Sequence, residues 1–458
     1  MEYQFTGWFA DWPALMGVLS ALMLGAVTDI SNLLRELKDD KVPEMWMRGH
    51  TFTNRIMSAA EKKQVNTRAY IIPRWTADAG DARSKTFEGD SYANGTNAFT
   101  DEMTVSPVGV SVSFSATEAM RFAARNTIVA VQDFWAKFQA RRIDRFKDHM
   151  ECWWNANSND GIAAILSGVQ NTTEYLMDSA DDPYGGYLLI PGATYQIIAS
   201  ASFPDTVRAT APHRVIPGGG GLNKRAVPAY AQFAQSNGST AAAITGFTAE
   251  DRVVFHGLGN AGFASLPHLV SSLATGTVQG VSRTDPENRP TRIDGGGNPV
   301  DAGLVRRLYA DIFKYRGGME SSDDLIPYCS QEQIVNWLNS AQAVANIQLT
   351  DASGAGIGEI YDRFLGDVKV NKKKPLVSSR ANPTQFRFIR LSDFMLLTVK
   401  DVGMRKNVAG GVIHEQHDAD GLLATAYSIH VDFWGNLAFR DVAGMGVIYN
   451  LSKPTLGD

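Results

Sequence analysis

The feature that most constrains this chain is a long stretch, residues 118–154, that contains neither glycine nor proline. Within it Ile128, Val131, Trp135 and Phe138 recur at helical spacing and form one apolar stripe. A helix over the whole stretch would measure roughly 54 Å at about 1.5 Å per residue, which is longer than a small domain is wide. The sequence therefore predicts one helix that is longer than a single small core requires.

This stretch is locally basic in an acidic chain. Between Arg121 and Met150 there are seven Lys or Arg and three Asp, whereas the whole chain carries a formal net charge of −5. Arg141 with Asp144, and Arg145 with Asp148, stand three residues apart, which is typical of ion pairs on a solvated helix face. The alternative is that the arginines face acidic neighbours or nucleic acid. Arg141 and Arg145 are therefore candidate contact residues between subunits.

Upstream of this stretch, two strand-like runs flank a long polar loop. Residues 108–115 alternate apolar and small polar side chains, and the β-branched and aromatic run at 65–75 is its expected partner. Between them, residues 76–104 are rich in Gly, Asp, Asn, Ser and Thr. A loop of this length is uncommon unless it has a function, such as lying on a neighbouring subunit; a surface loop without contacts is the alternative. The candidate contact residues in the loop are Arg83, Lys85, Phe87 and Tyr92.

An uncharged, apolar run occupies residues 12–28 near the N-terminus. It lies at the lower limit of what crosses a bilayer, and acidic residues flank it where a secretory signal would be basic. We expect the run to be buried against this or another subunit, with a signal peptide and a membrane-surface helix as alternatives. A pI near 5.9 also argues against a chain whose whole surface binds nucleic acid.

The remainder of the chain indicates an α+β fold. Residues 161–299 are rich in glycine and small residues, which is typical of loops and short strands. Helical spacing returns at 301–316, and Ser330 is the expected N-cap of a helix over 331–341. Three apolar runs then predict strands within 386–399, 425–433 and 437–451.

No motif in the sequence carries a convincing catalytic or metal-binding pattern. A G-x-G-x-x-G match at 257–262 is followed by Pro267, which interrupts the helix that a dinucleotide needs. His414 and His417 stand three apart rather than the four typical of a zinc-binding helix. Cys152 lies on the expected long helix beside Trp153 and Trp154 and is expected to be a core thiol. We therefore expect no enzyme activity, no cofactor and no bound metal.

The order of these parts resembles that of the major capsid proteins of tailed bacteriophages, which have the Hong Kong 97 fold. The likeness is carried by the hairpin at 65–115, the helix at 118–154, the helical run Val305–Phe313 and the closing strands at 431–450. It implies five regions: an N-terminal arm (1–61), an extended E-loop hairpin (62–117), the spine helix of the peripheral (P) domain (118–156), an axial (A) domain with an insertion around 200–299 (157–425), and C-terminal P-domain strands (426–458).

The resemblance also implies the function and the partners. The chain would assemble with itself, as pentamers and hexamers, into an icosahedral shell that encloses double-stranded DNA without sequence-specific binding. It would be a virion component assembled in the host cytoplasm, without contact to a membrane, and its further partners would be portal, scaffold and decoration proteins. Some relatives cross-link an E-loop lysine to an asparagine; Lys85 with Asn436 or Asn450 are the residues of those types, but we expect non-covalent contacts.

Two other classes of protein are compatible with the composition. A secreted carbohydrate-active enzyme or carbohydrate-binding protein would account for the nine Trp and fourteen Tyr. As an enzyme it would need two carboxylates roughly 5–10 Å apart in a cleft. A cellular nanocompartment shell would share the fold and differ in its cargo.

Overall fold

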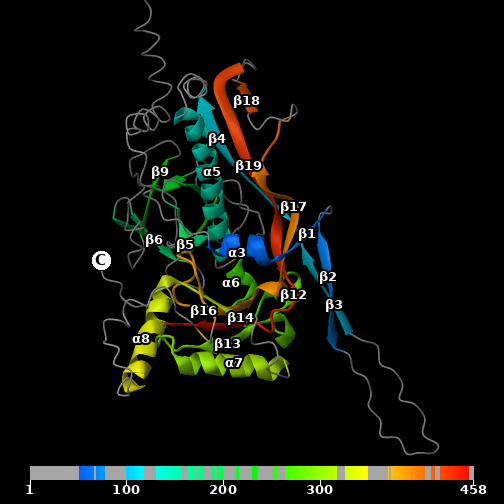
Figure 1. Ribbon diagram of the computed structural model, residues 1–458, viewed down its shortest axis with the longest axis vertical. Helices are drawn as coiled ribbons and strands as arrows, with labels where there is room; N and C mark the ends of the chain where they lie inside the picture. Colours follow the sequence, from blue (N-terminus) through cyan, green and yellow to red (C-terminus); the bar gives the residue numbers. More distant parts are fainter. Residues whose placement is uncertain are drawn as a thin grey trace, which may run out of the picture. The chain divides into compact units, whose positions relative to one another are not determined.

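The computed structural model describes most of the strands and helices that the sequence predicts (Figure 1). The chain divides into two compact units, residues 1–47 and 48–458, and all described residues belong to the second. The described residues are 51–65, 69–77, 99–117, 130–156, 162–171, 174–178, 188–190, 193–199, 213–215, 230–235, 251–255, 264–316, 325–348, 370, 373–407, 414–417 and 423–452. The expected N-terminal arm therefore lies almost wholly outside them.

The predicted long helix is present as α5 (Ala130–Asn155). In its final turns the spacing of Phe146, Met150 and Trp153 predicts a continued apolar face, and all three side chains are buried. The neighbouring Trp154 is fully buried too. Cys152 is buried as well, which confirms it as a core thiol. Residues 118–129, and the side chains of the stripe from Ile128 to Phe138, lie outside what the structure describes.

Helix α5 packs on a five-stranded sheet with the strand order β1-β17-β19-β18, in which β4 also pairs with β19. The ring of Trp154 meets that of Phe433 edge-on, with 6.4 Å between ring centroids. Along β19, Ile429, Val431 and Phe433 are buried on one face; on the other face Trp434 is half exposed, whereas Asp432 is buried. The strands are β1 (Glu61–Gln64), β4 (Val108–Thr117), β17 (Phe394–Met404), β18 (His414–His417) and β19 (Leu423–Phe439).

The strand partners predicted for the hairpin are wrong. Strand β2 (Tyr70–Ala77) pairs with β3 (Phe99–Val105) in an antiparallel two-stranded sheet, while β4 pairs with β19. Strand β3 was missed because its sequence, FTDEMTV, carries charged and threonine residues that read as part of the polar loop. Alternation identifies a strand but not its partner, and several apolar runs of similar length compete here. The segment between the two hairpin strands is therefore 78–98 rather than 76–104, and it lies outside the described residues.

The middle of the chain forms a closed barrel with the strand order β10-β5-β6-β9-β8-β7. It starts directly after α5, well before residue 200 where the insertion was expected to begin. Closure accounts for the small-residue composition, since side chains must fit inside a narrow barrel. The strands are β5 (Ala163–Asn171), β6 (Glu174–Asp178), β7 (Thr194–Ile198), β8 (His213–Val215), β9 (Tyr230–Gln235) and β10 (Arg252–Phe255).

A second five-stranded sheet, with the order β13-β20-β16-β14-β15, has its own hydrophobic core. Helix α7 (Ala302–Arg316) covers it through Leu308 and Ile312, whose side chains approach Gly446 of β20. Ser330 caps α8 (Gln331–Gln348) as predicted, since its Oγ accepts from the Gln333 backbone N–H at 3.4 Å. The strands are β13 (Thr291–Asp294), β14 (Leu325–Cys329), β15 (Leu376–Val377), β16 (Phe386–Arg390) and β20 (Gly446–Tyr449).

Short elements complete the described chain and support the hairpin and the sheets. These are helix α3 (Thr51–Ala59), helix α6 (Leu266–Leu269), strands β11 (Thr277–Val278) and β12 (Val281–Ser282), and the 3-10 turns η4 (Pro286–Asn288) and η6 (Leu391–Asp393). The mixture of helices, antiparallel pairs and parallel pairs confirms the predicted α+β class.

Candidate functional site at the root of the hairpin

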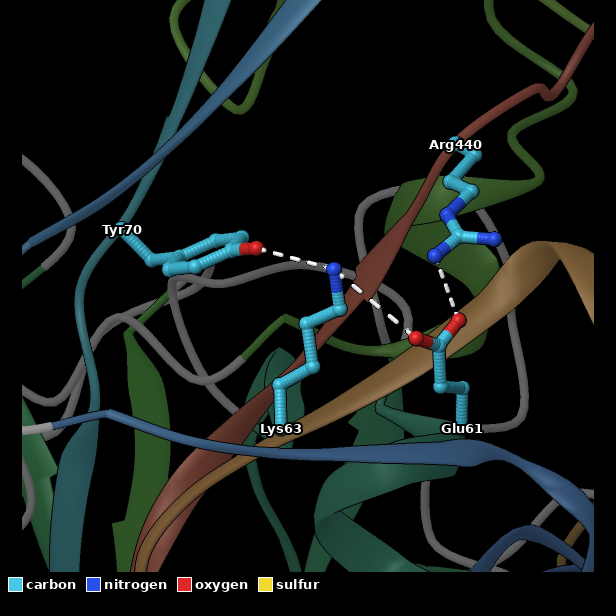
Figure 2. A network of polar contacts seen from close by, with 4 residues as sticks. All are labelled: Glu61, Lys63, Tyr70 and Arg440. Carbon is cyan, nitrogen blue, oxygen red and sulfur yellow. Dashed lines mark hydrogen bonds and ion pairs between the residues drawn. The ribbon is translucent and has the colours of Figure 1, made fainter.

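The root of the β2–β3 hairpin is held by a chain of polar contacts that starts on the edge strand β1 (Figure 2). Glu61 Oε2 accepts from Arg440 Nη2 at 2.5 Å, and Glu61 Oε1 lies 3.8 Å from Lys63 Nζ. Lys63 Nζ in turn donates to the Tyr70 hydroxyl at 3.1 Å and lies 5.7 Å from the centre of that ring. One continuous network therefore joins β1, the first residue of the hairpin and the end of β19.

This network is exposed, and its energy is correspondingly small. The side chains of Glu61 and Arg440 are 42% and 47% exposed. Exposed ion pairs contribute about 0.2–1 kcal/mol each, because water screens them and long side chains must be ordered. The contacts therefore set the direction in which the hairpin leaves the sheet without fixing it strongly.

Replacing Glu61 by glutamine is expected to lower the free energy of unfolding by no more than about 1 kcal/mol. The loss should shrink as salt is added, because the contact is an exposed ion pair. Urea unfolding at low and high ionic strength measures both effects. A loss of several kcal/mol that persists in high salt would contradict a weak, solvated network.

The other strand of the hairpin is anchored by backbone contacts. The Thr104 N–H donates to the Gln279 carbonyl at 2.8 Å, in the turn between β11 and β12. Gln279 and Gly280 both have positive φ, at 50° and 89°, as a two-residue type I′ turn requires. Glutamine is unusual at such a position, but its Nε2 donates to the Leu437 carbonyl at 3.3 Å, which holds the turn on β19.

Asn436 ties the strand after the hairpin to the same place. Its Oδ1 accepts from the backbone N–H groups of Ala264 and Leu437, both at 2.9 Å, and its Nδ2 donates to the Ser106 carbonyl at 2.8 Å. The side chain is buried, so both ends of the amide serve to join segments of one chain. This geometry leaves Asn436 unsuited to cross-linking, whereas Asn450 is exposed and donates to Asp294 Oδ1 at 2.9 Å.

The contact residues predicted from the sequence fall into two groups. Arg83, Lys85, Phe87 and Tyr92 lie outside the described residues, and so does the side chain of Arg141. Arg145 is partly buried within the chain, and burial lowers its pKa despite the neighbouring Tyr195 and Asp148. Because Asp148 is also buried, the interpretation of Arg145 and Asp148 as a solvated face is wrong.

A buried polar cluster at the end of α5 was missed. The carboxylate of Glu151 accepts from the Phe52 N–H at 3.1 Å, from the Thr53 N–H at 2.7 Å and from the Thr53 hydroxyl at 2.8 Å. Ser378 Oγ donates to the same carboxylate at 2.6 Å. One acidic side chain therefore caps α3 and fastens it, together with the segment after β15, to the long helix.

Further hydrogen bonds join this cluster to strand β14 through Asn155. Asn155 Nδ2 donates to the Glu151 carbonyl at 2.8 Å, and its Oδ1 accepts from the Tyr328 hydroxyl on β14. Burial raises the pKa of Glu151 more than its hydrogen bonds lower it. The only sequence signal was a lone Glu between Met150 and Cys152 in an otherwise apolar turn.

The described residues contain no group of three His, Cys, Asp or Glu side chains arranged to hold a metal ion. His414 and His417 lie on strand β18 rather than in the polar loop that the sequence indicated. Among the helices that the structure describes, none is long and apolar enough to cross a bilayer.

The parts described above occur in the order that the sequence predicts: a hairpin, a long helix, a sheet that receives the closing strand β19, and a second sheet with its own helices. No protein-family model matches the chain, and no curated protein sequence matches it.

The chain is similar to several solved structures of phage capsids. It shares 12% identity with a chain of the cyanophage A-1(L) capsid asymmetric unit, covering 91% of this chain and 96% of that one, with a TM-score of 0.48. It shares 8% identity with a chain of the mature capsid of bacteriophage PhiM1, covering 92% of this chain and 91% of that one, with a TM-score of 0.42. With a chain of the capsid of Myoviridae phage XM1 it shares 7% identity, covering 90% of this chain and 95% of that one, with a TM-score of 0.41.

Proposed function

We propose that this chain is the major capsid protein of a tailed bacteriophage, and that its role is structural rather than enzymatic. One observation carries the proposal. The β1 side of the hairpin root is held by weak, exposed contacts, whereas the long helix and the sheet are held together by buried ones. A subunit of a closed shell needs a rigid body and a segment that adapts to its neighbour, because copies in different rings meet at different angles.

The domains follow from the two sheets. We assign α5 and the sheet of β1, β4, β17, β18 and β19 to the P domain, and the second sheet with α7 and α8 to the A domain. The boundary expected at 425–426 falls inside β19, and β17 pairs with β19 along most of its length, so the P domain takes β17 as well. The barrel of β5 to β10 is the inserted domain.

The partners follow from the proposal. The chain binds copies of itself as pentamers and hexamers and encloses double-stranded DNA without reading its sequence. It is then a component of the virion, assembled in the host cytoplasm, with portal, scaffold and decoration proteins as further partners. None of the described features favours a carbohydrate-active protein: the half-exposed Trp434 stands alone on its face among small and polar side chains.

The purified chain is expected to form pentamers, hexamers or closed shells as its concentration rises, since each copy offers different surfaces to its two neighbours. Light scattering gives the mass relative to the 49.9 kDa subunit, and negative-stain electron microscopy shows any shells. A chain that remains a monomer at high concentration, with crowding agents and in high salt would contradict the capsid proposal.

A further inference from the structure

A polar hollow of about 230 Å³ lies between the turn η4, the start of β13 and the segment that joins the two sheets. It is lined by Pro286, Arg289, Pro290, Thr291, Arg292 and Ala443. Two guanidinium-bearing residues thus share one small cavity. Because like charges repel, such an arrangement is favourable only with a counter-charge at hand.

None of the ion pairs between described residues involves Arg289 or Arg292. Among the described residues, Arg289 makes no side-chain hydrogen bond or ion pair. Arg292 Nη1 donates to the Ser272 carbonyl at 2.5 Å, which is a neutral acceptor. The carboxylate of Asp441, close to Ala443 in the chain, accepts from the Ala443 N–H at 2.9 Å.

The walls of the hollow are rigid. Pro286 and Pro290 fix two backbone φ angles. Asn288 is buried, and its Nδ2 donates to the Ser282 carbonyl at 2.9 Å, which holds the turn in place. On the other side, β13 pairs in register with β20, so Arg292 starts from a fixed strand position. A preformed site loses little conformational entropy when it binds a ligand.

We propose that this hollow, named here the arginine pocket, binds a phosphate-type oxyanion through Arg289 and Arg292. The guanidinium group presents several N–H donors in a planar fork that matches two oxygens of one phosphate, and its charge is permanent. The ion would bridge the loop before β13 and the connection between β19 and β20, and so join the two sheets. This inference does not depend on shell assembly.

Titration calorimetry on the full chain tests the proposal, with sodium phosphate compared with sodium chloride at equal ionic strength. We expect saturable binding of phosphate only. Arg289→Gln should weaken it at least about tenfold, since a charge-assisted hydrogen bond contributes about 1.5–3 kcal/mol. Arg289 is the informative position because the change removes no described contact within the chain, whereas Arg292→Gln also removes the bond to Ser272.

The matched control is Arg306→Gln, which removes one exposed arginine of α7 that does not line the pocket and should leave binding unchanged. A second titration with a short DNA duplex distinguishes free phosphate from a phosphodiester. Binding of the duplex alone, lost in Arg289→Gln but kept in Arg306→Gln, assigns the pocket to nucleic acid backbone. Absence of saturable binding of both probes, or equal affinity of Arg289→Gln and the parent chain, would overturn the proposal.

Discussion

Replacing Glu151 by alanine is expected to lower the free energy of unfolding by about 3–5 kcal/mol. The change removes the acceptor of four hydrogen bonds, two of them from the first backbone N–H groups of α3. Those donors remain buried without a partner, and each unsatisfied donor costs about 1–3 kcal/mol. Helix α3 should therefore detach first. Urea unfolding followed by tryptophan fluorescence measures the loss, since Trp154 lies 6.2 Å from Phe52 between ring centroids.

Two variants separate this effect from a general loss of charge. Asp144→Ala removes an acidic side chain from a partly exposed position on the same helix and should change stability by less than about 0.5 kcal/mol. Ser378→Ala removes one donor but leaves the carboxylate in place, so its cost should be only about 1 kcal/mol. If Glu151→Ala were as mild as Asp144→Ala, the carboxylate would not be what holds α3 on α5.

Glu151 also gives the protein a defined pH dependence. Its pKa in the folded state is raised, with burial as the largest cause. A raised pKa means that folding favours the protonated form, so the contribution of this group is fully present below its unfolded pKa of about 4.3. That contribution falls as the pH rises through the folded pKa. The stability advantage of the parent chain over Glu151→Gln should therefore be larger at pH 5 than at pH 8.

Elements set by local patterns were predictable, and partnerships between distant segments were not. The end of α5 follows from the spacing of Phe146, Met150 and Trp153, and the start of α8 follows from Ser330. Strand β3 escaped prediction because its two-stranded hairpin buries one face, which carries Met103 and Val105, while its other residues are mostly polar. The barrel escaped because most of its strands, β6 to β10, are only three to six residues long.

The candidate site was predicted least well, for a physical reason. Glu61, Lys63 and Arg440 are ordinary surface charges in the sequence, and only the parallel pairing of β1 with β17 brings them near the end of β19. Glu151 likewise gives no local signal in the sequence, because the groups that donate to it lie on α3, far away along the chain. Charge pairs separated by hundreds of residues leave no local signal, whereas ion pairs within one helix do.

Replacing Gly435 by alanine is expected to lower the free energy of unfolding by about 3 kcal/mol or more. A Cβ there would lie 2.4 Å from the Leu397 carbonyl oxygen and 2.7 Å from Phe433 Cζ. The first neighbour is backbone of the adjacent strand β17, which cannot move without breaking its pairing with β19. The central strand β19 would therefore lose its register with β17. Its Phe433 ring, against which α5 packs through Trp154, would also be displaced.

Gly403→Ala is the matched control, because it lies on β17 in the same sheet and a Cβ there would come no nearer than 3.8 Å to any neighbour. Its stability should change by less than about 0.5 kcal/mol. The urea concentrations at which the two soluble variants are half unfolded compare their stabilities directly. If only Gly435→Ala is recovered in inclusion bodies, that also supports a loss of stability at this position. Equal midpoints would show that β17 and β19 can separate at low cost, and that the rigid body required of a shell subunit is held mainly by α3 and Glu151 instead.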